Sequence, residues 1–301
     1  MAFNTIRQTR VPLKLAGEPK LVKHVQDVLQ ITGATLLTAT MLCSAVAAGG
    51  LVGLAISFRN LPDVRALRNY IPTETSYIYD MDGALLDSLH DEANREVVDL
   101  NENSPHLKRA VLAVEDSDFY EHSGINPVGI GRAFLANFQA GNTVQGGSTI
   151  TMQLIKNLFL SPQQAISRKV AEVVLSLRLE QIFEKDEFLD MYLNQVDWGH
   201  NTYGVETAAQ SYFNKSSKEL PLAEASMMAG LIKAPEGLSP FVDYQAAKRE
   251  QSLVLDRMQN LQWITPAEAQ AAKQQPLRLG QVTSFNSSKA PYVTEAVVQE
   301  L

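Results

Sequence analysis

The chain contains 301 residues, of which 45% are hydrophobic and 20% are charged, an ordinary composition for a globular protein. Its net charge of -7, without any stripe of basic residues, argues against a nucleic-acid-binding protein, although local basic sites can still bind phosphate. The single cysteine, Cys43, excludes an internal disulfide bond and a cysteine-based zinc cluster.

The N-terminal part contains a long apolar stretch. Residues 1–27 are polar and basic, whereas residues 28–58 contain no charged side chain. About 20 apolar residues suffice for a helix to cross the hydrocarbon core of a bilayer. Residues 28–58 are therefore predicted to form a transmembrane helix behind a cytoplasmic tail. A cleaved signal peptide is the alternative, because Ala45-Val46-Ala47 resembles a cleavage site, but the apolar run continues well past it.

Residues 59–100 are predicted to form a juxtamembrane connector followed by a β-hairpin. Runs of β-forming residues flank Asp82-Gly83, a dipeptide typical of two-residue hairpin turns. A further short strand is expected at 96–100, which reads EVVDL.

Residues 101–260 form the main predicted domain, because helical periodicity extends through most of them. Ser104 and Pro105 are typical of the N-cap and the first position of a helix. Further helices are predicted at 127–140, 161–183, 186–195, 204–212, 221–233 and 244–260. The fold class is therefore mainly α with a small β element.

The chemically densest stretch is 114–157, where acidic, aromatic, imidazole and hydroxyl side chains gather. Glu115 ends a predicted helix beside Phe119 and Tyr120, so its carboxyl group is expected to be partly desolvated. Desolvation raises the pKa of a carboxyl group and suits it to proton transfer near neutral pH. Glu115 is therefore the first catalytic candidate.

These residues begin a series of motifs in a fixed order. The series is Glu115-Asp116-x-x-Phe119-x-x-His122-x-Gly124, Arg132, Gly146-Gly147-Ser148-Thr149-Ile150-Thr151-x-Gln153, Lys156-Asn157, Arg168-Lys169-x-x-Glu172, Tyr192-Leu193-Asn194, Gly204-Val205, Tyr212-Phe213-x-Lys215 and Glu224-Ala225. Over about residues 75–260 the chain thereby resembles the peptidoglycan glycosyltransferase modules of glycosyltransferase family 51. These modules occur in class A penicillin-binding proteins and in monofunctional transglycosylases.

The resemblance implies a lysozyme-like bilobal fold and an enzyme that polymerises lipid II by inverting displacement of undecaprenyl diphosphate. It implies that Glu115 is the general base that activates the 4-hydroxyl of the acceptor sugar. Taken alone, Glu115 could instead cap its helix or pair with Arg132 or Lys156, but the order of the motifs favours catalysis. The residues expected to support the loop around Glu115 are Asp116, Phe119, His122 and Arg132.

The leaving diphosphate requires positive charge. Lys156 and Arg168 are the expected diphosphate ligands, because lysine offers a compact charge and arginine a bidentate fork. The other substrate-binding candidates are Ser148, Thr149, Gln153, Asn157 and Lys169. Two positions depart from the family pattern: Gln164 replaces the usual arginine, and Met152 replaces a common glutamine.

Glu172 follows Lys169 by three residues and Arg168 by four, so the three side chains share one face of a helix. As an exposed charge cluster they would contribute about 0.2–0.5 kcal/mol per pair. The resemblance instead implies that Glu172 is a second catalytic acid near the leaving diphosphate. A carboxylate repels phosphates, so this role requires the two neighbouring cations or a divalent cation, Mg²⁺ or Mn²⁺. Glu172 is the candidate metal ligand.

The resemblance also implies a location and partners. The protein is expected to be a single-pass protein of the inner (cytoplasmic) membrane with its catalytic domain on the outer, periplasmic face. Basic residues on the two sides of the apolar stretch are nearly balanced and do not by themselves decide the orientation. The expected partners are the membrane, lipid II, the growing glycan chain and other cell-wall synthesis proteins. Phe134 and Phe138, at helical spacing, belong either to the core or to a membrane contact that guides the lipid tail.

Residues 261–301 resemble the linker that joins family members to a penicillin-binding transpeptidase domain. Thr265-Pro266 begin a short helix, and a polar segment follows. No Ser-x-x-Lys or Lys-Thr-Gly sequence is present, so the chain is expected to be a short family member or a piece of a longer bifunctional protein.

Two other functions stay open from the sequence. One is a glycan-cleaving, lysozyme-like enzyme that uses a single glutamate, and the other is a non-catalytic cell-wall scaffold. Lys156 and Arg168 disfavour glycan cleavage, because that reaction has no diphosphate to bind.

Overall fold

A computed structural model of the chain describes residues 20–59, 61–89, 94–142, 146–160 and 166–280, together with Tyr292, Glu295 and Gln299. The chain divides into two compact units, Met1–Asn60 and Leu61–Leu301.

The described residues of the first unit form one helix, α1 (Lys20–Arg59), which begins before the apolar stretch predicted at 28–58. Its segment Ile31–Gly50 is the one helical segment of the described residues long and apolar enough to cross a membrane. Hydroxyl side chains in this segment donate to carbonyl groups of the preceding turn, as Thr35 Oγ1 does to Ile31 O at 2.9 Å. Such bonds satisfy polar groups where no water is present.

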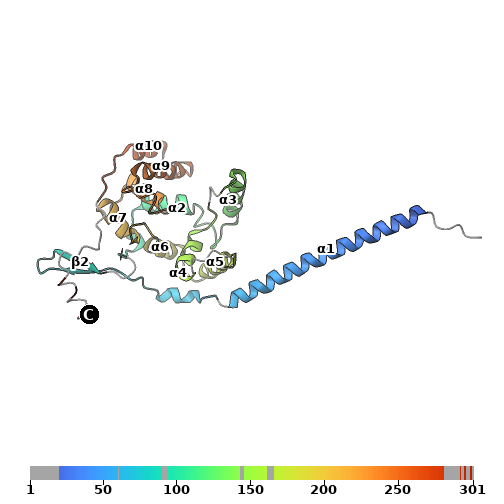
Figure 1. Ribbon diagram of the computed structural model, residues 1–301. Helices are drawn as coiled ribbons and strands as arrows, with labels where there is room; N and C mark the ends of the chain where they lie inside the picture. The colour runs from blue at the N-terminus through green and yellow to red at the C-terminus, as the bar shows by residue number, and fades with distance from the viewer. Residues whose placement is uncertain are drawn as a thin grey trace, which may run out of the picture. The chain divides into compact units, whose positions relative to one another are not determined.

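The described part of the second unit is mainly helical with two small sheets, so the predicted fold class is confirmed (Figure 1). Its α-helices are α2 (Pro105–Glu115), α3 (Pro127–Ala140), α4 (Ile150–Phe159), α5 (Ile166–Leu179), α6 (Lys185–Gln195), α7 (Val205–Phe213), α8 (Leu222–Leu231), α9 (Tyr244–Asn260) and α10 (Pro266–Gln274). The 3-10 helices are η1 (Val64–Asn69), η2 (Leu100–Glu102) and η3 (Ser217–Glu219). The strands are β1 (Ser76–Tyr79), β2 (Leu85–Leu89), β3 (Asn94–Arg95) and β4 (Thr202–Tyr203).

The predicted hairpin is confirmed, since β1 and β2 pair antiparallel with Ser76 opposite Leu89. Asp80 organises its turn, because its Oδ1 accepts hydrogen bonds from the backbone N–H groups of Asp82 and Ala84 at 2.9 and 2.7 Å. Gly83 has a φ of 82°, a conformation that favours glycine.

The prediction of a strand at 96–100 is wrong. The observed strand β3 lies just before it and pairs parallel with β4. The backbone N–H groups of Glu96 and Val98 donate to side chains instead, to Thr207 Oγ1 at 2.7 Å and to Asn194 Oδ1 at 3.1 Å. Side-chain acceptors from distant helices therefore replace the neighbouring strand that the sequence pattern implied.

The core joins two groups of helices. Helix α8 packs against α2 and α9, and α4 packs against α5 and α6 (Figure 1). All residues of α8 from Ala223 to Leu231 are buried, so it is the central helix of its group. This packing fixes α2, whose last residue is Glu115.

Most of the predicted helices are confirmed within two residues at each end, but the region before α6 differs. The helix expected at 161–183 is α5, which ends at Leu179, and residues 161–165 lie outside the described residues. A capping box of Glu184 and Glu187 begins α6 shortly afterwards. Helix α4 was not predicted; Thr149 caps it by accepting a hydrogen bond from Met152 N at 3.2 Å.

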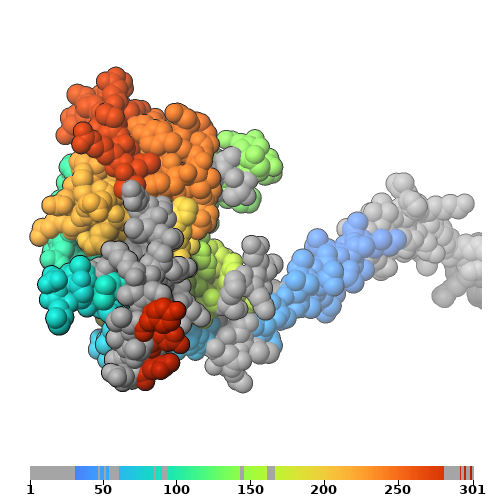
Figure 2. Space-filling model, turned by 60° about the vertical axis from the view of Figure 1, so that its left-hand side comes forward, coloured from blue at the N-terminus to red at the C-terminus, as the bar shows by residue number. Residues whose placement is uncertain are grey.

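Helix α3 has the predicted bounds but few contacts with the core, since Ala133 is its one buried residue. Phe134 and Phe138 are 71% and 77% exposed and stack on each other, so the core interpretation of these aromatics is wrong. In the space-filling view, green α3 stands out beside the orange surface of α8 and α9 (Figure 2).

Candidate active site

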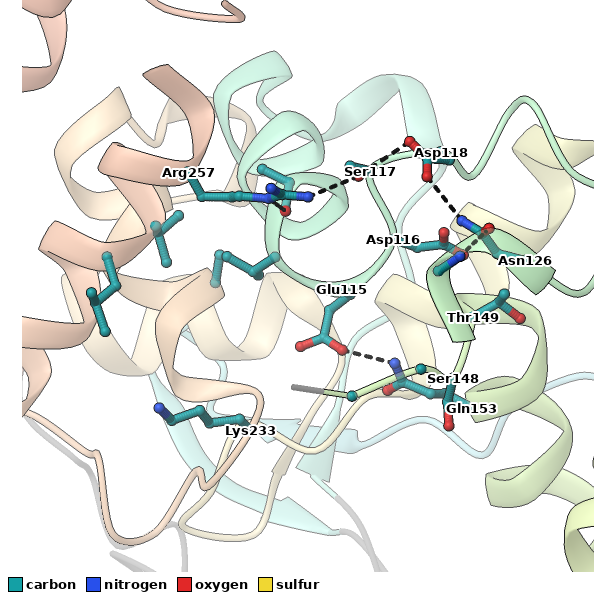
Figure 3. A pocket seen from close by; sticks show the side chains of 18 of the residues that line it. Glu115, Asp116, Ser117, Asp118, Asn126, Ser148, Thr149, Gln153, Lys233 and Arg257 are labelled. Atoms are coloured by element: carbon teal, nitrogen blue, oxygen red, sulfur yellow. Dashed lines mark hydrogen bonds between the residues drawn. The ribbon is translucent and has the colours of Figure 1, made fainter. Parts of the chain in front are cut away.

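A cavity of about 760 Å³ opens at the C-terminal end of α2. One wall comes from α3, residues 146–149 and α4, and the opposite wall comes from α8, the residues just after it and α9. Glu115 and the turn that follows it lie between these walls (Figure 3). The most chemically dense part of the sequence therefore borders an open cavity rather than a sealed interior.

Glu115 is half-buried at the end of α2. Burial is the main cause that raises the pKa of its carboxyl group above the usual value, and the charge of Asp116 raises it further. A hydrogen bond from Gln153 Nε2 to Glu115 Oε2, 2.7 Å long, and the charge of Lys156 act in the opposite direction. The result is a carboxyl group of raised pKa that faces the cavity with one hydrogen-bond donor fixed against it.

The side-chain amide of Gln153 is itself held in place by a second hydrogen bond. The buried Tyr192 donates a hydrogen bond from its hydroxyl group to Gln153 Oε1 at 3.3 Å. Because the amide oxygen is engaged in this way, the amide nitrogen points at Glu115.

Asp116 is buried and connects the turn after α2 to the start of α4. Its Oδ2 accepts a hydrogen bond from Ile150 N at 3.1 Å, and His122 Nε2 lies 3.0 Å from both carboxylate oxygens. The neighbouring Phe119 is 1% exposed, and Lys185 Nζ lies 4.6 Å from the centre of its ring. These side chains pack and bond the loop around Glu115.

Gly124 closes this loop against α5. Its φ is 85°, and a Cβ atom there would lie 2.8 Å from the backbone oxygen of Ser176. Its own carbonyl oxygen accepts a hydrogen bond from Thr149 Oγ1 at 2.7 Å. Only glycine fits this position without displacing backbone.

The predicted cationic residues fall into two groups. Lys156 is exposed and lines the cavity with Glu115, and Arg132 lines it from α3, where its Nη2 lies 3.4 Å from Asp118 Oδ2. Arg168 and Lys169 lie on α5 and do not line the cavity.

Glu172 also lies away from the cavity lining, but one side chain connects it to the rim. Its buried carboxylate lies 2.8 Å from Lys169 Nζ and 3.3 Å from Arg168 Nε. Lys169 Nζ also donates to Ser148 Oγ at 2.6 Å, and Ser148 lines the cavity. The structure therefore brings Ser148, Thr149, Gln153 and Lys156 to Glu115, whereas Asn157 is exposed outside the lining.

The described residues do not fit a divalent cation held by the protein. Among them, no group of three or more His, Cys, Asp or Glu side chains could hold a metal ion. The two carboxylate oxygens of Glu172 each face a cationic side chain. A role for Mg²⁺ or Mn²⁺ stays a prediction.

Several lining residues were missed from the sequence, among them Lys233, Glu250 and Arg257 on one wall and Ser117, Asp118 and Asn126 in and after the turn that follows Glu115. Lys233 Nζ and Glu250 Oε1 form an ion pair of 2.8 Å on the wall opposite Lys156. Lys233 follows the C-terminal end of α8, where a lysine is ordinarily interpreted as a residue that interacts favourably with the helix dipole. Only the packing of α9 against α2 and α8 brings Glu250 and Arg257 to the cavity, and no local pattern indicates it.

Comparison with known proteins identifies the family. A family model described as Transglycosylase matches residues 82–259, more than half of the chain. The chain therefore belongs to the transglycosylase family.

The similar relatives are much longer proteins. The chain is 40% identical over 244 residues to penicillin-binding protein 1A of Aquifex aeolicus, covering 81% of this chain and 34% of that protein. It is 38% identical over 260 residues to penicillin-binding protein 1A of Escherichia coli, covering 86% of this chain and 30% of that protein. The crystal structure of penicillin-binding protein 1A from Haemophilus influenzae is 26% identical, covers 77% of this chain and 24% of that chain, and has a TM-score of 0.44. The chain thus spans about a third of the length of the curated relatives it matches.

Proposed function

We propose that the chain polymerises lipid II into peptidoglycan glycan strands. The observation that carries this proposal is the pairing, in one cavity of a transglycosylase-family domain, of a half-buried glutamate with cationic side chains. A carboxylate can accept a proton at one place while cations stabilise a departing diphosphate at another.

Glu115 acts as the general base. Its carboxylate accepts the proton of the 4-hydroxyl group of the acceptor sugar as that oxygen attacks C1 of the donor sugar. The bond from C1 to the diphosphate oxygen breaks on the opposite face, so the configuration at C1 inverts and undecaprenyl diphosphate leaves. The raised pKa of Glu115 makes it a stronger base than an ordinary carboxylate, which favours the transfer near neutral pH.

Lys156 contributes positive charge to the cavity, and Lys169 reaches its rim through Ser148. Arg168, Lys169 and Glu172 would support the diphosphate from behind this rim. Met152 is fully buried, so its departure from the family pattern concerns packing. Gln164 lies outside the described residues.

The apolar surfaces agree with a substrate that carries a lipid. In this proposal α1 anchors the protein in the inner membrane with the catalytic domain on the periplasmic face. The exposed Phe134 and Phe138 meet the lipid tail or the membrane surface. The growing glycan chain and other cell-wall synthesis proteins are the further partners, and the chain can belong to a longer bifunctional penicillin-binding protein.

The test is incubation of the purified chain, in detergent, with labelled lipid II and divalent metal. Labelled polymer is the expected product. Shortening of preformed glycan without polymer would support a lysozyme-like cleaving enzyme, and neither product would support a non-catalytic scaffold. The cations beside Glu115 favour the first result, because glycan cleavage releases no diphosphate.

A first prediction concerns Gln153. Replacement by leucine keeps the bulk beside Glu115 but removes the donor that stabilises the ionised carboxylate, so the pKa of Glu115 should rise further. A general base must be ionised, and activity is lost as pH falls through its pKa. In Gln153→Leu the acid limb of kcat/KM should therefore move to higher pH.

Tyr192→Phe is the matched control for Gln153→Leu, because it removes only the hydroxyl group that bonds the amide oxygen. Its acid limb should move less. An acid limb in Gln153→Leu that stays in place, or moves to lower pH, would contradict the assignment of Glu115.

A second prediction concerns Glu172→Gln. This change removes the charge that holds Lys169 and Arg168, so their charges should be less well ordered and polymerisation should fall about 10-fold. The metal concentration that gives half-maximal activity should stay unchanged, since both oxygens already face cations. Titration with Mg²⁺ or Mn²⁺ measures this, and a clear shift of the midpoint would make Glu172 a metal ligand.

A further inference from the structure

A chain of hydrogen bonds runs along the cavity from α9 to α3, and we name its four members, Arg257, Ser117, Asp118 and Asn126, the polar strap (Figure 3). Arg257 Nη2 donates to Ser117 Oγ at 3.1 Å, and Ser117 Oγ donates to Asp118 Oδ1 at 3.3 Å. Asn126 Nδ2 then donates to Asp118 Oδ2 at 2.9 Å. The strap thus joins the two walls of the cavity through the turn that follows Glu115.

Arg257 also forms a hydrogen bond with the segment that precedes Glu115. Its Nε donates to the carbonyl oxygen of Ala113 at 3.2 Å. One rigid guanidinium group therefore contacts the chain two residues before and two residues after Glu115. Its positive charge lies at the C-terminal end of α2, where the helix dipole favours a cation.

The backbone of Arg257 is held in place by the packing of its helix. Helix α9 buries Val254, Leu255 and Met258 in the core beside it. At the far end, Asn126 caps α3, since its Oδ1 accepts a hydrogen bond from Gly129 N at 2.7 Å. Because α3 buries only Ala133, this cap is an important attachment of that wall.

We propose that Arg257 is a positioning residue for Glu115. By holding both sides of Glu115, and α3 through the strap, it fixes the direction of the carboxylate toward the reacting hydroxyl group. This inference rests on the proposed function and names a residue that acts through Glu115.

The test compares Arg257→Ala and Ser117→Ala with wild type, using the full chain and labelled lipid II. A misplacement of about 1 Å at a catalytic group costs about 100-fold in rate. We expect kcat to fall 10- to 100-fold in Arg257→Ala, with KM changed by less than about twofold. Arg249→Ala is the matched control, an exposed arginine of the same helix outside the cavity lining, and should keep wild-type kcat. Millimolar guanidinium ion should restore part of kcat in Arg257→Ala.

Several outcomes would overturn the proposal. A raised KM with unchanged kcat would make Arg257 a substrate ligand. A lowered Tm with unchanged kcat would make it a purely structural residue. If Arg257→Ala does not fold, Arg257→Lys, which keeps the charge but cannot reach both acceptors with one planar group, should lower kcat; full kcat in that variant would also overturn it.

A measurement without substrate separates this inference from the proposed function. Arg257 and Ser117 act as one unit, so the loss of Tm in the double variant should be smaller than the sum of the two single losses. Additive losses would contradict the strap even if polymer forms. If wild type makes no polymer, the proposed function fails, whereas non-additive Tm values would still show the strap.

Discussion

Glu115→Gln is expected to lower kcat for polymerisation about 10³-fold, the middle of the range that general bases contribute. Glutamine keeps the shape of the side chain and still offers an oxygen to Gln153 Nε2, so the fold should be unchanged. Its amide cannot take up the proton of the acceptor hydroxyl group. Initial rates with labelled lipid II, together with the thermal unfolding of both proteins, measure the effect.

Glu121→Gln is the control for Glu115→Gln. Glu121 is exposed in the same loop and does not line the cavity, so this variant should retain wild-type kcat. Near-normal polymerisation by Glu115→Gln, with an acid limb like that of wild type, would remove Glu115 from the role of base. The residual rate of Glu115→Gln should lose the acid limb altogether.

Asp116→Ala is expected to lower the free energy of unfolding by about 3 kcal/mol, because hydrogen bonds to a charged group contribute roughly 1.5–3 kcal/mol and buried partners left unpaired add to the cost. The variant leaves Ile150 N and the His122 ring without their buried acceptor. Denaturant unfolding of the chain in detergent, with the slope compared between variants, measures the change.

Asp256→Ala is the matched control for Asp116→Ala. Asp256 is half exposed and pairs with Lys273 on the surface, so its loss should change the free energy of unfolding by less than about 1 kcal/mol. Equal losses in the two variants would show that the buried carboxylate does not anchor α4.

The parts of the fold that were predictable follow local rules. Ser104 before Pro105 begins α2 as expected, and Asp82-Gly83 turns the hairpin, because capping and turn chemistry depend on adjacent residues. The strand expected at 96–100 failed because Asn194 and Thr207, about a hundred residues away, supply the acceptors that a neighbouring strand would have supplied. Sequence spacing carries no information about such distant partners.

The residues of the candidate site divide in the same way, into those that local sequence predicts and those that depend on distant packing. Glu115, Gln153 and Lys156 could be predicted together because they occupy one run of motifs, and they line one cavity. Lys233 and Arg257 come from the opposite wall, which exists only once α8 and α9 have packed on α2. The exposure of Phe134 and Phe138 also required the structure, because periodicity alone does not tell a core face from an outward one.

The close backbone contact at Gly124 has a consequence for the spacing of the two sides of the candidate active site. The loop that follows Glu115 and the helix that bears Glu172 approach there with no room for a single methyl group between them. Because backbone packs against backbone there, this contact would keep the distance between Glu115 and the side chains of α5 that support the diphosphate in the proposed reaction nearly constant.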